Sequence, residues 1–410
     1  MRAASVVVGA LAAFGLGFAP SAAAYDAQSK QWYLSPMQAE QMWKFSTGKG
    51  VKVAVIDSGV NPDTPSLKGQ VLADEVPKSV AYHATDDYSG HGTTMAELIA
   101  GTGSGGGIQG LAPGAKIVPY RVALTGMKGA TEEKEKTPDS WRAIRAAADT
   151  DAKIISMSYG GLLSVKEEEA VKYAASKGKL MIAAVGNAGE SKGGTDYPAA
   201  YPYVVGVSSI DSSSTVSKFS SFGNYVDLAA PGEGFPGWCD SSFRSYCDDK
   251  QGTSPATAIT SASAALIWSA HPNWTVNQVV RSLIDTAGRT WAKGTPSKYL
   301  GYGPVRPRKV LANPHYNAGP AYSDPLAKEN KTDGEELVTE VSPSPSPSPS
   351  ASPSSQAPKE SSGGATSAAG SSAESSNDSS KSLWIALGAA AAVIVIGGAG
   401  VAVMRARRVT

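Results

Sequence analysis

Three segments that are far apart in the sequence each place a reactive side chain beside glycines. Asp57 lies in VAVIDSG, His91 in SGHGTTMA and Ser254 in QGTSPATA. A serine hydroxyl becomes a strong nucleophile when a histidine takes its proton and a carboxylate holds that histidine in the correct tautomer. We therefore predict that Ser254 is the nucleophile, His91 the general acid and base, and Asp57 the orienting carboxylate of a hydrolase.

A fourth polar residue, Asn187 in AAVGNAG, lies between His91 and Ser254 in the sequence. We expect Ser254 to start a helix, where free backbone N–H groups favour a developing oxyanion, and the Asn187 amide would donate a second hydrogen bond to it. Taken alone, Asp57 and Asn187 could be turn residues and Ser254 a helix cap. The occurrence of all four together favours a catalytic site. The remaining histidines are typical of loops or helix ends: His83, His271 and His315.

The surrounding segments alternate between strand-like and helix-like patterns. Compact apolar runs predict strands over 51–57, 116–123, 153–161, 179–187, 203–210 and 226–232. Helices are predicted over 93–100, 140–150, 165–178 and 254–269. Buried strands separated by such helices are typical of a parallel sheet covered on both faces, so we predict an α/β fold. Functional residues gather at the carboxyl ends of parallel strands, where Asp57, Ser158 and Asn187 are expected.

Several motifs resemble those of the subtilisin-like serine proteases, and the order Asp, His, Ser is the subtilisin order of this triad. The matching segments are VAVIDSGV, GHGTTMAELIAG, ISMSYGG, AAVGNAG and GTSPATA. The segment AALIWSAHPNWTVNQVVRSLIDTA is similar to the helix pair that follows the nucleophile in that family, so the likeness runs through residues 50–290. The resemblance implies a serine endopeptidase with an extended cleft, in which the substrate pairs as a strand.

The same resemblance implies a set of cleft residues, which are otherwise explained as buried strand. They are Ser158, Tyr159 and Gly160 on one side, and Ala183, Ala184 and Val185 on the other side of the specificity pocket. One departure concerns the family's usual proline four residues after the nucleophile, which is Ala258 here, while Pro255 directly follows Ser254. Proline is tolerated in a first helical turn, so we expect an intact nucleophile.

The two ends of the sequence predict export and a membrane anchor. Residues 1–24 combine a positive start, an apolar stretch and an A-x-A site, which is typical of a signal peptide. Residues 382–404 form a transmembrane helix in this interpretation, because they are apolar over a length that crosses a hydrocarbon core of about 30 Å. The basic tail, 405–410, places the C-terminus in the cytoplasm. Residues 317–381 read as a disordered Ser/Pro/Ala-rich stalk.

A short extension, 25–50, precedes the predicted catalytic domain, 51–316, and is too short for a folded inhibitory propeptide of the usual subtilisin kind. With the stalk and anchor it resembles the mycosins, which are membrane-anchored subtilisin-like proteases associated with type VII secretion in actinobacteria. The resemblance implies cleavage of exported proteins outside the cell membrane, beside a secretion complex. One alternative is a structural component of such a complex in which proteolysis is secondary. Another is a nutrient-scavenging protease, which tethering disfavours.

The cysteines, acids and net charge bear on cofactors and partners. Cys239 and Cys247 are the only cysteines and favour a local disulfide in an exported protein, with free thiols or metal ligation as alternatives. A net charge of +1 gives no indication of nucleic-acid binding. We expect no cofactor: the pairs Asp86–Asp87 and Asp248–Asp249 could hold structural calcium, but solvated loop acids explain them better. The charged insert 131–140 either gates the cleft or is solvated.

Overall fold

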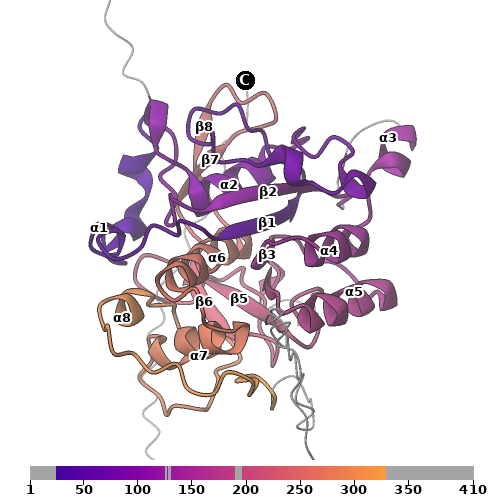
Figure 1. Cartoon of the computed structure of the whole chain (residues 1–410). Coiled ribbons are helices and arrows are strands. Elements are labelled where there is room, and N and C mark those ends of the chain that lie inside the picture. The colour runs from indigo at the N-terminus through magenta and orange to yellow at the C-terminus, as the bar shows by residue number, and fades with distance from the viewer. Residues whose placement is uncertain (1–24, 125–126, 128–130, 190–195, 329–410) are drawn as a thin grey trace, which may run out of the picture. The chain divides into compact units, whose positions relative to one another are not determined.

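Six parallel strands form the centre of the computed structural model, which describes residues 25–124, 127, 131–189 and 196–328 (Figure 1). The strands are β1 Lys52–Asp57, β2 Lys116–Arg121, β3 Ile154–Met157, β4 Leu180–Ala184, β5 Val204–Ile210 and β6 Leu228–Pro231. They lie in the order β2-β1-β3-β4-β5-β6, and every neighbouring pair is parallel. The predicted α/β fold with a parallel central sheet is confirmed.

Helices cover both faces of this sheet. They are α1 Ala39–Trp43, α2 His91–Ala100, α3 Thr131–Lys136, α4 Ser140–Ala148, α5 Val165–Ser176, α6 Thr253–Ala270, α7 Val276–Thr286 and α8 Arg308–Leu311. Successive strand residues point to opposite faces. Val53 and Val55 of β1 therefore join the core cluster of α2 and α6, whereas Ala54 and Ile56 join the cluster of α4 and α5.

Helix α6 is the central helix of the fold and is buried over most of its length. Its sequence, TSPATAITSASAALIWSA, is rich in small residues, which let the helix approach β3, β4, β5 and β6 closely. Most of its buried hydroxyls are hydrogen-bonded; Ser261 Oγ, for example, donates to Ser156 Oγ over 3.0 Å, whereas the Thr260 hydroxyl has no partner among the described residues. Pro255 lies in the first turn and does not interrupt the helix, and Ala258 is buried. The close packing of α6 holds its first turn, and with it Ser254, at the carboxyl edge of the sheet.

The predicted extension packs against the core on the α2 and α6 side. Tyr33 is fully buried, and its ring stacks on that of Phe235 at 4.9 Å. The Trp43 indole N–H donates to the carbonyl of Leu111 at 2.8 Å. These apolar and polar contacts make residues 25–50 part of the folded body.

Two features of the described residues differ from the prediction. The first part of the predicted stalk, 317–328, packs against the body: Leu326 is buried, and the Gln278 side chain donates to the carbonyl of Gly319 at 3.1 Å. The boundary predicted after residue 316 is therefore too early, because α7 side chains satisfy the backbone of a segment that has little apolar pattern of its own. A hairpin of β7, Phe235–Trp238, and β8, Tyr246–Lys250, was also not predicted, since β8 is short and polar.

The first six residues of the charged insert form α3, which has no buried residue, so the structure favours the solvated interpretation for this part of the insert. Glu133 of this helix forms an ion pair with the buried Arg121 at the end of β2. Within the described ranges, none of the helices has the length and apolar character needed to cross a bilayer. The predicted signal peptide, most of the stalk, the transmembrane segment and the basic tail lie outside the described residues.

Candidate active site

Asp57 and His91 meet where β1 ends and α2 begins. His91 Nδ1 lies 2.7 Å from Asp57 Oδ1, and the Asp57 side chain is fully buried, whereas 39% of the His91 side chain is exposed. The amide of Ser58 donates to the same carboxylate oxygen at 2.7 Å. With the shared proton on His91 Nδ1, Nε2 is the basic nitrogen. The arrangement therefore suits a histidine base oriented by a buried carboxylate.

The pKa of His91 is raised above its usual value. Burial acts to lower it, but the charge of Asp57 and its hydrogen bond to the imidazole outweigh that effect, and the charge of Asp87 adds to them. A raised pKa favours the imidazolium that forms when a histidine takes a proton from a serine hydroxyl.

Asp87 holds the N-terminus of α2 in place, a role that the sequence analysis missed. Its carboxylate is buried and accepts hydrogen bonds from Ser58 Oγ, Ser89 N, Ser89 Oγ, Gly90 N, Thr93 N and Thr93 Oγ1. The interpretation of Asp87 as a solvated loop acid is therefore wrong, because free N–H groups at the start of a helix attract a carboxylate. An aspartate shortly before a predicted helix is the signal that could have found it.

Ser254 lies in the first turn of α6 and lines a cavity of about 240 Å³ together with His91, Asn187, Trp238 and Lys250. Its hydroxyl donates to the backbone carbonyl of Ser158 at 3.1 Å. The structure thus brings Ser254 and His91 to one cavity without a hydrogen bond between the described side chains. Proton transfer to His91 requires the hydroxyl to rotate away from the Ser158 carbonyl.

Asn187 lies just beyond β4 and is oriented by the start of α6. Its side-chain oxygen accepts hydrogen bonds from the Thr253 amide at 2.9 Å and from the Thr253 hydroxyl at 3.0 Å. Because the oxygen is used in this way, the amide N–H₂ group is left to donate elsewhere. Asn187 lines the same cavity as Ser254.

The residues expected to line the cleft differ in their surroundings. Gly160 is exposed, whereas the Tyr159 hydroxyl donates to Glu167 on α5 at 3.1 Å. The polar end of Tyr159 is therefore bound to a side chain of α5. Ala183, Ala184 and Val185 are buried, and Ala183 and Val185 belong to the core cluster of α4 and α5.

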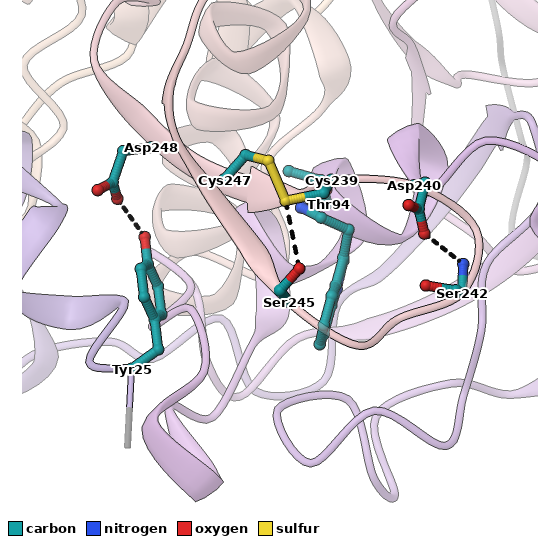
Figure 2. The surroundings of a disulfide bond; sticks show 9 residues. Tyr25, Thr94, Cys239, Asp240, Ser242, Ser245, Cys247 and Asp248 are labelled. Atoms are coloured by element: carbon teal, nitrogen blue, oxygen red, sulfur yellow. Dashed lines mark hydrogen bonds between the residues drawn. A yellow bond between two sulfur atoms is a disulfide. The ribbon is translucent and has the colours of Figure 1, made fainter. Parts of the chain in front are cut away.

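A disulfide-closed hairpin forms another wall of the cavity. Cys239 and Cys247 are joined by a disulfide, which confirms the predicted pairing (Figure 2). Trp238, which lines the cavity, stacks on Tyr246 at 3.9 Å. The ring of Tyr25, in the extension, also stacks on the ring of Tyr246, at 5.5 Å. The extension therefore supports the hairpin that borders the cavity.

Neither acidic pair that was considered for calcium forms a cluster of potential ligands. Among the described residues, no three His, Cys, Asp or Glu side chains gather as a metal site would require. Asp86 pairs with His83 at 2.8 Å, and Asp248 accepts a hydrogen bond from Tyr25 (Figure 2). These side chains therefore have partners within the protein.

A parallel α/β sheet that brings a buried carboxylate, a histidine and a helix-initiating serine to one edge is the architecture of a serine hydrolase. Residues 48–303 match the family model described as the subtilase family. This range is more than half of the chain, so the chain belongs to the subtilase family and is a serine endopeptidase.

Individual relatives agree with this family. The chain is similar to thermitase of Thermoactinomyces vulgaris, with 33% identity over 291 residues that cover 66% of this chain and 95% of thermitase. Among solved structures it is similar to MycP1 from Mycobacterium smegmatis, with 25% identity, a TM-score of 0.58, and coverage of 74% of this chain and 89% of that one. The MycP3 protease from the type VII (ESX-3) secretion system matches with 28% identity and a TM-score of 0.56, covering 71% of this chain and 90% of MycP3.

Proposed function

We propose that this subtilase is a membrane-tethered, extracytoplasmic endopeptidase that cleaves exported proteins through Asp57, His91 and Ser254. The observation that carries the catalytic part is the 2.7 Å contact between His91 and the buried Asp57, beside a cavity that Ser254 also lines. Ser254 Oγ would attack the substrate carbonyl carbon while His91 Nε2 takes the hydroxyl proton.

The tetrahedral intermediate and its breakdown follow from the same groups. The oxyanion would accept hydrogen bonds from the Asn187 amide and from a free N–H at the start of α6. His91 would then give its proton to the leaving amine, which breaks the peptide bond and leaves an acyl-enzyme on Ser254. A water molecule deprotonated by His91 would hydrolyse this ester and restore the serine hydroxyl.

The setting of the enzyme is the second part of the proposal. The signal-like residues 1–24 and the apolar residues 382–404 support export and a single membrane anchor, with the catalytic domain outside the membrane. The similarity to MycP1 and MycP3 supports an association with type VII secretion, because MycP3 is a protease from the type VII (ESX-3) secretion system. Protein substrates and a secretion complex in the membrane are then the expected partners.

Two separate substitutions test the catalytic proposal. We expect Ser254→Ala and His91→Ala each to abolish cleavage of a fluorogenic peptide library and of exported proteins, while the control Ser35→Ala, at an exposed serine, leaves both unchanged. Cleavage sites are read by mass spectrometry of the proteins exported by strains carrying each variant. Cleavage that persists in both active-site variants would show that these residues are not the triad.

A structural role in a secretion complex is the second candidate. One matched MycP1 structure is described as an essential component of the type VII (ESX-1) secretion system, and this favours considering a scaffold. Secretion restored by full-length Ser254→Ala protein, but not by a chain that lacks 382–410, would support scaffolding. The opposite pattern would leave proteolysis as the main role.

A further inference from the structure

Asp196 lies between two glycines that follow neighbouring strands of the sheet. A Cβ atom added to Gly160, after β3, would lie 3.4 Å from Asp196 Oδ1. A Cβ atom added to Gly186, after β4, would lie 1.7 Å from Asp196 Oδ2. Two non-bonded atoms cannot approach so closely, so no side chain fits at Gly186 with Asp196 in this position. The carboxylate therefore occupies a slot that exists because Gly186 lacks a side chain, and its other oxygen lies at ordinary contact distance from the Cβ position of Gly160.

This slot is close to the catalytic residues. Strands β3 and β4 are paired in parallel, so their carboxyl ends are adjacent. Ser158, two residues before Gly160, accepts the hydrogen bond of the Ser254 hydroxyl, and Asn187 directly follows Gly186. The side chain of the substrate residue whose carbonyl is attacked by Ser254 would therefore extend between these two strand ends.

Among the described residues, the Asp196 carboxylate forms no ion pair, and none of their hydrogen bonds ends on its carboxylate oxygens. Burial raises its pKa above the usual value for an aspartate. The nearby Ser221 hydroxyl accepts a hydrogen bond from the Ala188 amide at 3.1 Å. A half-buried carboxylate in this state gains stability from a cation that enters the slot.

We propose that Asp196 is a specificity-determining residue, which selects substrates with arginine or lysine on the N-terminal side of the scissile bond. The inference deepens the proposed function and rests on it. The methylene stem of such a side chain fits a slot walled by glycine backbone, and its charged end would reach the carboxylate. An apolar substrate side chain in the same slot would remove water from the Asp196 carboxylate without giving it a new partner.

The test uses fluorogenic peptides that differ only in the residue before the scissile bond. We expect the wild-type kcat/KM to be about 10- to 100-fold higher for arginine or lysine than for leucine. Asp196→Asn should remove most of this advantage and change the leucine peptide by less than about threefold, while Asp196→Lys should favour glutamate. Asp74→Asn, at an exposed aspartate on the surface, is the matched control and should keep the wild-type preference.

Two results would overturn the inference. One is a wild-type preference for leucine or phenylalanine at this position. The other is an equal loss for the arginine and leucine peptides in Asp196→Asn, which would indicate a structural role. Labelling by a small fluorophosphonate reports whether Ser254 remains reactive, since that probe has no residue to place in the slot. Absent labelling of the wild-type protein overturns the proposed function together with the inference, whereas a labelled enzyme with an apolar preference overturns the inference alone.

Discussion

The buried Asp87, at the start of α2, and the half-buried Asp196, beside Gly160 and Gly186, have opposite surroundings. Asp87 accepts hydrogen bonds from backbone amides and hydroxyls at the start of α2, and both of its oxygens are used. Asp196 stands between two glycines with no such partners among the described residues. The first arrangement holds the start of α2, and with it His91, in place, whereas the second leaves a carboxylate that could accept an incoming ligand. The hydrogen-bond partners of a carboxylate therefore indicate its role better than its position near a cavity does.

The substitution Asp57→Asn, which tests the contact between Asp57 and His91, should have the largest effect. We expect kcat to fall by about 10⁴-fold, because the asparagine amide can donate to His91 Nδ1 and so favours the wrong tautomer. Steady-state kinetics on an arginine peptide would measure the change, with the thermal unfolding midpoint as a check of folding. A loss below about tenfold would show that Asp57 does not orient the base.

Loss of the Asn187 amide should have the next largest effect. Asn187→Ala is expected to lower kcat by about 10²–10³-fold with little change in KM, because the amide acts on the oxyanion of the transition state. Asn187→Asp is the matched variant, since it keeps an oxygen for the Thr253 donors but supplies no amide N–H. Wild-type kcat in the aspartate variant would contradict the assignment.

Glu97, on the helix α2 that begins at His91, should make the free energy of unfolding depend on pH. It is fully buried, its oxygens accept hydrogen bonds from Thr64 and Tyr246, and burial raises its pKa from 4.5 to about 7. A raised folded pKa gives stability that is present below pH 4.5 and is lost as the pH rises through 7. Relative to Glu97→Gln, the wild-type free energy of unfolding should fall by about 2–3 kcal/mol between about pH 5 and pH 8. Urea unfolding of both proteins at the two pH values measures this, and parallel curves would contradict it.

The smallest effect is expected for Asp87→Asn. The asparagine N–H₂ cannot accept the bonds that one carboxylate oxygen accepts from Thr93, so His91 should be held less firmly and kcat/KM should fall about tenfold. Since the charge of Asp87 raises the pKa of His91, its loss should also move the acidic limb of the kcat/KM profile to lower pH. The neighbouring control Asp86→Asn removes an exposed acid and should leave the profile in place. If the acidic limb of the kcat/KM profile is unchanged in Asp87→Asn, then Asp87 acts on folding only.

Much of the fold was predictable because its signals are local. The alternation of apolar runs with helical segments predicts the parallel sheet, and α6 differs from its predicted range by one residue at each end. The hairpin of β7 and β8 was not predictable in this way, because the polar β8 is held by its disulfide and by aromatic stacking of Tyr246 on Trp238 and on Tyr25, which is distant in the sequence. Packing likewise moved the end of the folded body beyond residue 316, through α7 contacts that no local pattern contains.

The sequence motifs were sufficient to predict the family and to select Asp57, His91, Ser254 and Asn187 as candidate site residues. Each of these residues lies in a short motif whose chemistry is local. Their catalytic roles stay predictions that the substitutions above test. The groups that surround Asp87 and Asp196 are seen only in the tertiary structure. Whether a carboxylate is satisfied or left to a ligand depends on the groups that surround it, and these come from strand ends and helix termini that meet only in the folded chain.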